Sequence, residues 1–382
     1  MNTTELATNW YDRFQRFASD LYPGRYTRAF CQELAEQAIE VRAIAHEKQS
    51  VIVAHNYQYP ELQEVADVVG DSLGLALEVR NRRARRVDFS SVHFMGATAK
   101  IILGDATRVY VQGSPEIHGC SLVLGTNHRW VENWKTKHPS GACVTYVNSD
   151  VRTKAMSEYI STSRNTAAVI ARAAREYDGQ ILVLPDKFLG QVMKWQAVRE
   201  MGVDPNRIEI YNTHFAGFHA SCYVHERIGD DAPEQALAEY EDAELMLHPE
   251  CGCASSCLLK LDQGILPKDR VYYLSTEGML QRAKTSQAAR FIVGTESGMV
   301  YRLRKEMPER EFHPVSIHAV CDFMKQNTLA KLLHSLRHDE YEIILDDNAD
   351  PTHEVLEHGV IRINREVANR AKAGVERMLE TT

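Results

Sequence analysis

Short apolar runs alternate with helical patterns along this chain of 382 residues. Residues 5–48 have apolar positions at helical spacing and predict two helices, separated by a break at Tyr22-Pro23-Gly24. From Val51–Ala54 onward, continuous apolar runs are typical of strands buried on both faces of a parallel sheet. The last such run begins at Glu342, and a closing helix is expected from Asn364 to Leu379. The pattern predicts an α/β protein.

The same order of features occurs three times, at intervals of about one hundred residues, and such a period suggests internal repeats. In each third an apolar run ends in polar groups, a hydroxyl stands at a predicted helix start, and another apolar run follows. A last extended segment, clear in the first two thirds but faint before Cys321, then leads to a cysteine. The first runs end at Tyr57, Asn148 and Glu250; the hydroxyls are Ser72, Ser163, and Ser275 with Thr276; the next runs are Val92–Met95, 181–187 and 291–296; the cysteines are Cys120, Cys222 and Cys321. Any regular α/β chain shows some internal similarity, but here the polar ends and cysteines keep one order.

We therefore predict three related units. The first is formed by residues 1–120 with 322–382 and includes the N- and C-terminal helices, the second by residues 121–221, and the third by residues 222–321. The closing helix is expected to pack back on the first unit. No low-complexity linker separates the thirds, which favours one compact body with a shared site at its centre.

Composition narrows the class of protein. Hydrophobic residues make up 44% and charged residues 25% of the chain, which is ordinary for a globular protein. The formal charge of −8 and the lack of a basic block argue against nucleic acid or a membrane as partner. No signal peptide and no long apolar span stand out, and eight cysteines are too few for a disulfide scaffold. A cytoplasmic protein with thiols, some of them metal ligands, is the expectation.

The stretch around Cys321 points to metal chemistry. Apolar residues after it recur at helical spacing and predict a helix that begins near Cys321. A thiol at a helix N-terminus is favoured as the thiolate, which is the form that binds metals. A lone cysteine there is more often a small buried residue, so the case rests on three cysteines in equivalent places. Three thiolates suit an iron–sulfur centre or zinc and leave one metal position open.

Further polar groups are expected to face the same centre. Histidine and glutamate side chains supply proton transfer, and hydroxyls with backbone N–H groups at helix starts suit anionic ligands. Taken singly, each histidine is more often structural, but the set lies beside three predicted thiolates. The candidates are His55, Tyr57, Tyr146, Asn148, His225, His248 and Glu250, with the hydroxyls of Ser72, Ser163, Ser275 and Thr276.

Two alternatives stay open on the residues alone. A zinc-dependent aldolase or hydrolase acting on a phosphorylated or dicarboxylate substrate could use the same cysteines and histidines. An iron–sulfur redox sensor could instead use Cys251, Cys253 and Cys257, although their C-x-C-x3-C spacing is neither the usual zinc pattern nor a ferredoxin run.

From Val51 onward the chain resembles the quinolinate synthase family. The motifs that carry the resemblance are HNYQ (55–58), GDSL (70–73), VHFM (92–95), GCSL (119–122), TYVN (145–148), LPDKFLG (184–190), CYVHE (222–226), HPEC (248–251), STEGM (275–279), GTE (294–296) and CDFMKQNTL (321–329). The resemblance implies three similar three-layer αβα domains with short parallel sheets around a pseudo-threefold axis. It also implies a [4Fe–4S] cluster held by Cys120, Cys222 and Cys321, and no cluster role for Cys251.

The implied reaction condenses iminoaspartate with dihydroxyacetone phosphate to give quinolinate, phosphate and water in NAD biosynthesis. An L-aspartate oxidase or dehydrogenase would supply the imine. The open iron would act as a Lewis acid, and Tyr57, His225, His248 and Glu250 would move protons. The implied substrate contacts are His55, Ser72, Tyr146, Asn148, Ser163, Ser275 and Thr276.

Overall fold

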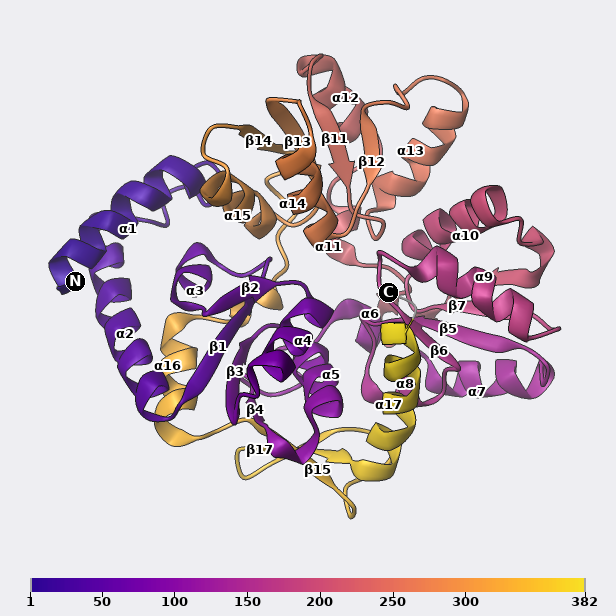
Figure 1. Ribbon diagram of the computed structural model, residues 1–382, viewed down its shortest axis with the longest axis horizontal. Coiled ribbons are helices and arrows are strands. Elements are labelled where there is room, and N and C mark those ends of the chain that lie inside the picture. Colours follow the sequence, from indigo (N-terminus) through magenta and orange to yellow (C-terminus); the bar gives the residue numbers. More distant parts are fainter. Residues whose placement is uncertain (1, 381–382) are drawn as a thin grey trace.

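Three sheets, each with four parallel strands in the same order, form the framework of the protein, whose computed structural model describes residues 2–380. In each sheet the second and third strands of a unit flank the first, and the fourth lies beyond the third. The three orders are β2-β1-β3-β4, β6-β5-β7-β8 and β12-β11-β13-β14. Figure 1 shows the sheets, with their helices, arranged around a common centre. The predicted fold class, α/β with several short parallel sheets, is confirmed.

The first sheet joins the two ends of the chain. Its strands are β1 (Ser50–His55), β2 (Val68–Gly70), β3 (Arg86–Ser90), β4 (Arg108–Tyr110), β15 (Glu342–Asp346), β16 (Val355–Glu357) and β17 (Val360–Asn364). β15 pairs antiparallel with β4 and parallel with β17, and so adds the C-terminal strands to the four parallel ones. The residues of this sheet thus come from both segments assigned to the first predicted unit, although the unit boundaries themselves stay predictions.

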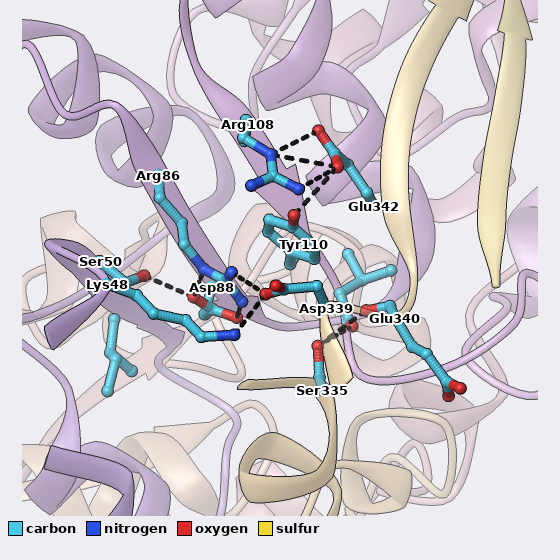
Figure 2. A network of polar contacts seen from close by, with 12 residues as sticks. Lys48, Ser50, Arg86, Asp88, Arg108, Tyr110, Ser335, Asp339, Glu340 and Glu342 are labelled. Atoms are coloured by element: carbon cyan, nitrogen blue, oxygen red, sulfur yellow. Dashed lines mark hydrogen bonds and ion pairs between the residues drawn. The ribbon is translucent and has the colours of Figure 1, made fainter. Parts of the chain in front are cut away.

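A polar network holds this junction at the edge where β1, β3 and β4 begin, shown in Figure 2. Arg86 donates to Asp88 at 2.8 Å and also reaches Asp339, which lies just beyond the end of α16 (Leu329–His338). The guanidinium of Arg108 lies 2.8 Å from the carboxylate of Glu342, across the β4–β15 pair. These contacts lie at the amino ends of the parallel strands, opposite the edge where ligands bind in such sheets.

The helices of the first unit lie on both faces of its sheet. They are α1 (Thr3–Ala18), α2 (Arg28–Glu47), α3 (Pro60–Val65), α4 (Ser72–Arg82), α5 (His93–Leu103), η1 (Gly104–Ala106), η3 (Met324–Gln326), α16 and α17 (Arg365–Glu380). The two predicted N-terminal helices are confirmed, and Asn2 with Glu5 forms a capping box at the start of α1.

The prediction of a strand at Val92–Met95 is wrong. These residues lead into α5, and the strand is β3, which starts six residues before Val92. β3 contains Arg86 and Asp88, which are buried and paired with each other, so the strand does not show a continuous apolar run. α5 is buried along nearly its whole length, and a helix buried on all sides shows no polar face. Periodicity therefore favoured the wrong segment.

The second unit is built on a fully parallel sheet. Its strands are β5 (Ala142–Tyr146), β6 (Tyr159–Ser161), β7 (Ile181–Leu184) and β8 (Ile208–Ile210), followed by a hairpin of β9 (His214–Phe215) and β10 (Phe218–His219). Its helices are α6 (Ser121–Leu124), α7 (His128–Lys137), α8 (Val151–Ala155), α9 (Thr166–Glu176), α10 (Lys187–Met201) and η2 (Pro205–Arg207).

The third unit repeats this plan. Its strands are β11 (Glu244–Leu247), β12 (Val271–Tyr273), β13 (Arg290–Gly294) and β14 (Glu311–Pro314). Its helices are α11 (Tyr223–Glu226), α12 (Ala232–Glu239), α13 (Gly252–Asp262), α14 (Thr276–Thr285) and α15 (Gly298–Glu306). The strand β14, only faint in the sequence pattern, is present ahead of Cys321.

The helix predicted to begin near Cys321 begins later, at Leu329. Thr328 is its N-cap and accepts the N–H of Lys331 at 3.2 Å. The side chain of Asn327 is also engaged elsewhere, since it donates to the carbonyl oxygens of Ser91 and Met324. These side-chain bonds separate α16 from the short turn that follows Cys321, which apolar spacing alone does not reveal.

The closing helix α17 packs against more than the first unit. It contacts α5 of that unit, but also α8 and β6 of the second. At Gly374 a Cβ atom would lie 2.9 Å from Cγ1 of Ile160, so glycine allows the helix to approach β6 closely. The expectation that α17 packs back on the first unit is therefore confirmed, and the helix also reaches the second unit. Along residues 2–380, no helix has both the length and the apolar character needed to cross a membrane.

Candidate functional site

One cavity between the three sheets is lined by every residue that the sequence suggested for the site. Those residues are His55, Tyr57, Ser72, Cys120, Tyr146, Asn148, Ser163, Cys222, His225, His248, Glu250, Ser275, Thr276 and Cys321. They come from all three units. Their chemical roles stay predictions, but the three thirds of the sequence do bring these side chains together.

The first strand of each sheet delivers two of these side chains. His55 and Tyr57 come at the end of β1, Tyr146 and Asn148 at the end of β5, and His248 and Glu250 after β11. Side chains two residues apart on an extended chain point to the same side, which explains the spacing of each pair. The carboxyl ends of the three central strands thus meet at the cavity.

The hydroxyl groups lie at helix starts or near them. Ser72 is the first residue of α4, and Ser275 is the N-cap of α14, where it accepts the N–H of Gly278 at 3.1 Å. Ser163 differs, because it lies in a turn before α9 and the N-cap position there is Asn165. Helix starts expose unpaired N–H groups and carry partial positive charge, so α4 and α14 suit anionic groups.

Each of the three cysteines follows the fourth strand of its sheet and opens a helical turn. Cys120 precedes α6, Cys222 precedes α11, and Cys321 precedes η3. All three are free thiols. Burial, together with the charges of the other cysteines, raises the pKa of Cys120 to about 12 and that of Cys222 well above its usual value. Burial also raises the pKa of Cys321 to about 11.

These pKa shifts bear on whether the site suits a metal centre. The thiols influence one another electrostatically, so they share one neighbourhood. Backbone N–H groups of Leu122 and Val123 face the sulfur of Cys120, and that of Met324 faces Cys321. At these pKa values the three groups are protonated thiols in the metal-free fold, contrary to the expectation of a thiolate near a helix start. Binding of a metal cation displaces the thiol protons and stabilises the thiolates, which the backbone N–H groups also favour. The donor set therefore fits an iron–sulfur cluster.

Glu250 is the central titratable group. Burial raises its pKa to about 7, against hydrogen bonds from Tyr146 and Asn148 that lower it. The amide of Asn148 donates to Oε1 at 2.7 Å. Oε2 lies 3.4 Å from Nδ1 of His225 and 3.8 Å from Nδ1 of His248. A carboxyl with a pKa near neutrality can both take up and release a proton at physiological pH.

The three histidines of the cavity are held neutral. Burial lowers the pKa of His225 to about 3 and that of His248 well below its usual value. Burial, with the positive charges of Arg302 and Lys325, lowers the pKa of His55 to about 3. Neutral imidazoles can accept a proton or donate a hydrogen bond to a substrate oxygen.

Thr295 was missed by the sequence analysis and connects two of the candidate groups. Its hydroxyl lies 2.6 Å from the Tyr57 hydroxyl and 3.3 Å from Nε2 of His225. His225 in turn faces Glu250, so a path of polar contacts runs from Tyr57 to Glu250. The available signal was the GTE motif, which directly follows a predicted strand just as HPE follows β11.

Asn56 and Arg302 were also missed. Asn56 lies between His55 and Tyr57 in sequence and points to the other side of the chain, where it donates to the Thr276 hydroxyl at 2.8 Å. Arg302, on α15, donates to the side-chain amide oxygen Oδ1 of Asn56. Through these contacts Asn56 and Arg302 fix the position of the Thr276 side chain. Each contact joins residues more than two hundred positions apart in the sequence, so no local sequence pattern reveals it.

The segment with three further cysteines does not offer three thiolates. Cys251 and Cys253 are joined by a disulfide bond, and Cys257 is buried in α13. Only one free thiol is left for a local metal site. This arrangement does not favour a sensor built on these three residues.

One family model and several named proteins are similar to this chain over most of its length. The family model described as "Quinolinate synthetase A protein" matches residues 39–380. A protein of Pyrobaculum aerophilum named quinolinate synthase is 36% identical over 342 residues, or 89% of this chain and 98% of the relative. One of Thermus thermophilus with the same name is 39% identical over 344 residues, covering 90% of this chain and 96% of the relative. A third, of Mycobacterium tuberculosis, is 39% identical over 81% of this chain and 83% of its own length.

Proposed function

The chain belongs to the quinolinate synthase A family of NAD biosynthesis, and we propose that its central cavity condenses iminoaspartate with dihydroxyacetone phosphate. The products are quinolinate, one phosphate and two water molecules, which balance the atoms of the two substrates. The observation that supports this most is the meeting of three free cysteines, Glu250 and Tyr57 in one cavity. The imine would come from an oxidase or dehydrogenase that acts on L-aspartate.

The anionic groups of these substrates suit the walls of the cavity. Carboxylates and phosphate would bind at the starts of α4 and α14, where Ser72, Ser275 and Thr276 offer hydroxyls beside unpaired backbone N–H groups. Tyr146 and Asn148 would add hydrogen-bond donors from β5, and Ser163 another hydroxyl. His55 would contact a substrate oxygen as a neutral imidazole.

Cys120, Cys222 and Cys321 would hold a [4Fe–4S] cluster. Such a cluster with three cysteine ligands supplies one iron with an open position, which acts as a Lewis acid on a substrate oxygen or nitrogen. The disulfide-bonded Cys251 and the buried Cys257 are not needed for it.

Proton transfer would use Glu250 and the path through Thr295. Glu250, with a pKa of about 7, would take the proton from a substrate carbon and return it to a leaving hydroxyl. Burial, together with the charge of Glu250, raises the pKa of Tyr57, so its phenol stays protonated and can donate to a substrate oxygen. The Thr295 hydroxyl would then pass a proton between Tyr57 and His225, and His248, which is stacked on His225 and faces the same Oε2 of Glu250, would assist.

The test is an anaerobic assay with the purified protein and both substrates. Quinolinate and inorganic phosphate should appear in equal amounts, and neither substrate alone should give quinolinate. Absence of quinolinate from protein that contains iron and acid-labile sulfide would contradict the proposal.

A zinc-dependent aldolase or hydrolase is the second candidate, and one observation favours it. The ligand atoms of Cys222, His225 and Glu250 all lie within 4.8 Å of one another, and zinc accepts sulfur, nitrogen and oxygen ligands. Metal analysis separates the two: one zinc per chain without sulfide would support this candidate.

A further inference from the structure

A buried ion pair lies directly behind the cavity. Glu296 follows β13, and its Oε1 lies 3.0 Å from the Lys325 ammonium, which belongs to the turn after Cys321. Their side chains are 0% and 6% exposed. Neither residue lines the cavity, so neither is a candidate for contact with the substrates.

Glu296 holds the backbone at Cys321. Its Oε1 also lies 3.4 Å from the Cys321 backbone nitrogen, which donates to it, and its Oε2 accepts the N–H of Gly298 at 2.6 Å. Gly298 is the first residue of α15. The carboxylate thus fixes the cysteine loop to the end of the third unit's sheet.

Lys325 connects the same loop to the first unit. Its backbone N–H bonds to the Cys321 carbonyl at 2.9 Å, closing one helical turn, and its ammonium donates to the carbonyl oxygen of Tyr57. The ammonium also lies 4.9 Å from the ring centroid of Tyr59 and 5.2 Å from that of Tyr22. Aromatic faces favour a cation at such distances.

The second unit has a related feature. Asp186 follows β7 by two residues, as Glu296 follows β13, and the backbone N–H of Cys222 is among the donors that face it. Asp186 also caps α10, through the N–H groups of Phe188 and Leu189, and no lysine within residues 2–380 is paired with it. An acid after the third strand thus faces the cysteine loop in two of the three units.

We propose that Glu296 and Lys325 are a positioning pair that holds the Cys321 loop and the backbone of Tyr57 in one fixed geometry. This inference rests on the proposed function, in which a metal-binding sulfur and a proton-donating tyrosine from different units must face the same substrate. A fixed geometry of the Cys321 loop and the Tyr57 backbone would keep both groups in place for that reaction. Stability alone is a weak reason for such a pair, since a neutral pair of similar shape is often no less stable than a buried ion pair.

The test uses Glu296→Gln, Lys325→Met and the double variant in the full chain, purified without oxygen. Each single variant leaves one buried charge unpaired and should lower Tm, and the double variant should recover much of that loss. The double variant should nevertheless release iron to a chelator about tenfold faster than the unchanged protein, in line with the roughly 10–100-fold loss of metal affinity that typically follows removal of a partner that orients a metal ligand. Its kcat should fall while KM stays the same.

A second readout does not depend on the metal or on quinolinate. After iron has been removed, iodoacetamide should alkylate Cys321 faster in the double variant than in the unchanged chain, whereas alkylation of Cys120 should not change. Peptide mass spectrometry measures both rates in one sample, with Cys120 as the internal reference.

The matched control is the pair Arg86 and Asp88, which is equally buried but lies at the opposite edge of the first sheet (Figure 2). The variant with Arg86→Met and Asp88→Asn should change Tm without changing iron release or the alkylation of Cys321. The proposal is overturned if the Glu296/Lys325 double variant matches the unchanged protein in Cys321 alkylation, or if the control raises it equally. If the unchanged protein contains no iron and sulfide, the proposed cofactor fails, and alkylation alone decides the positioning role.

Discussion

At the scale of single residues, the chemistry depends on one carboxyl group whose proton is available near neutral pH. Glu250 is fully enclosed, yet it keeps hydrogen bonds from Asn148 and Tyr146. Its position after a strand, two residues from His248, was readable from the sequence. Thr295 was not found in this way, because a threonine gains a proton-transfer role only through its two partners, Tyr57 of the first unit and His225, which lies 70 positions away in the sequence.

Replacement of Glu250 by glutamine should remove turnover and leave the metal centre in place. Glutamine keeps the shape and the contact with Asn148 but cannot exchange a proton, and general acid–base groups contribute about 100-fold or more to rate. Quinolinate formation, iron content and the visible absorption spectrum check this. Normal quinolinate formation by the variant would contradict the role of Glu250.

The raised pKa of Glu250 also predicts a pH dependence of stability. The folded state binds this proton more tightly than the unfolded state, whose carboxyl has its usual pKa of 4.5 against about 7 in the fold. The stabilisation is therefore complete below about pH 4.5 and is lost as the pH rises through about 7, by up to about 3 kcal/mol. In metal-free protein, the free energy of unfolding of Glu250→Gln should change less between about pH 5 and pH 8 than that of the unchanged chain. Equal pH dependence in denaturant titrations would show that Glu250 is ionised like an exposed carboxyl.

Replacement of Thr295 by valine should break the contact path between Tyr57 and His225. The expected result is a fall in kcat of about 100-fold with little change in KM, because the hydroxyl moves a proton and does not line the cavity. Serine, which keeps the hydroxyl, is the matched control and should retain most of the activity. Equal activity of the valine and serine variants would rule out the path.

At the scale of elements, local pattern identified the strands whose side chains are apolar and failed where charge is buried. β1, β5 and β11 were predicted together with the polar groups at their ends. The strand after β1, however, was predicted on residues of α5 and not at β3, because Arg86 and Asp88 interrupt the apolar run of β3. The start of α16 was predicted too early, near Cys321, for a similar reason: the polar side chains of Asn327 and Thr328 end one turn and cap the helix that follows. Such boundaries depend on side-chain hydrogen bonds, which the spacing of hydrophobic residues does not reveal.

Disruption of the polar network at the amino edge of the first sheet should lower stability without changing catalysis. Arg86→Met leaves the buried Asp88 without its ionic partner, and loss of one member of a buried pair costs about 3–5 kcal/mol. Denaturant titration should show this loss, whereas kcat measured well below the unfolding transition should stay the same. A fall in kcat with unchanged stability would mean that this edge is coupled to the cavity.

At the scale of the whole molecule, the repeat of about one hundred residues explains how distant residues share one site. Each unit contributes the end of its first strand and a cysteine after its fourth, and the common strand order brings these to the centre. The order of polar ends and cysteines in the sequence was enough to propose this convergence. The reach of α17 across two units could not be inferred in the same way, because it depends on the fit of Gly374 against Ile160.

The central claim is that three cysteines from three repeats bind one iron–sulfur centre. Iron and acid-labile sulfide should therefore be counted per chain in anaerobically purified protein, with Cys120→Ser, Cys222→Ser and Cys321→Ser beside a triple serine variant of Cys251, Cys253 and Cys257. The account predicts about four iron and four sulfide in the unchanged chain and in the triple variant, the content of a [4Fe–4S] cluster, and a large loss in each of the other three. Full iron and sulfide in any one of those three, or a loss confined to the triple variant, would contradict it.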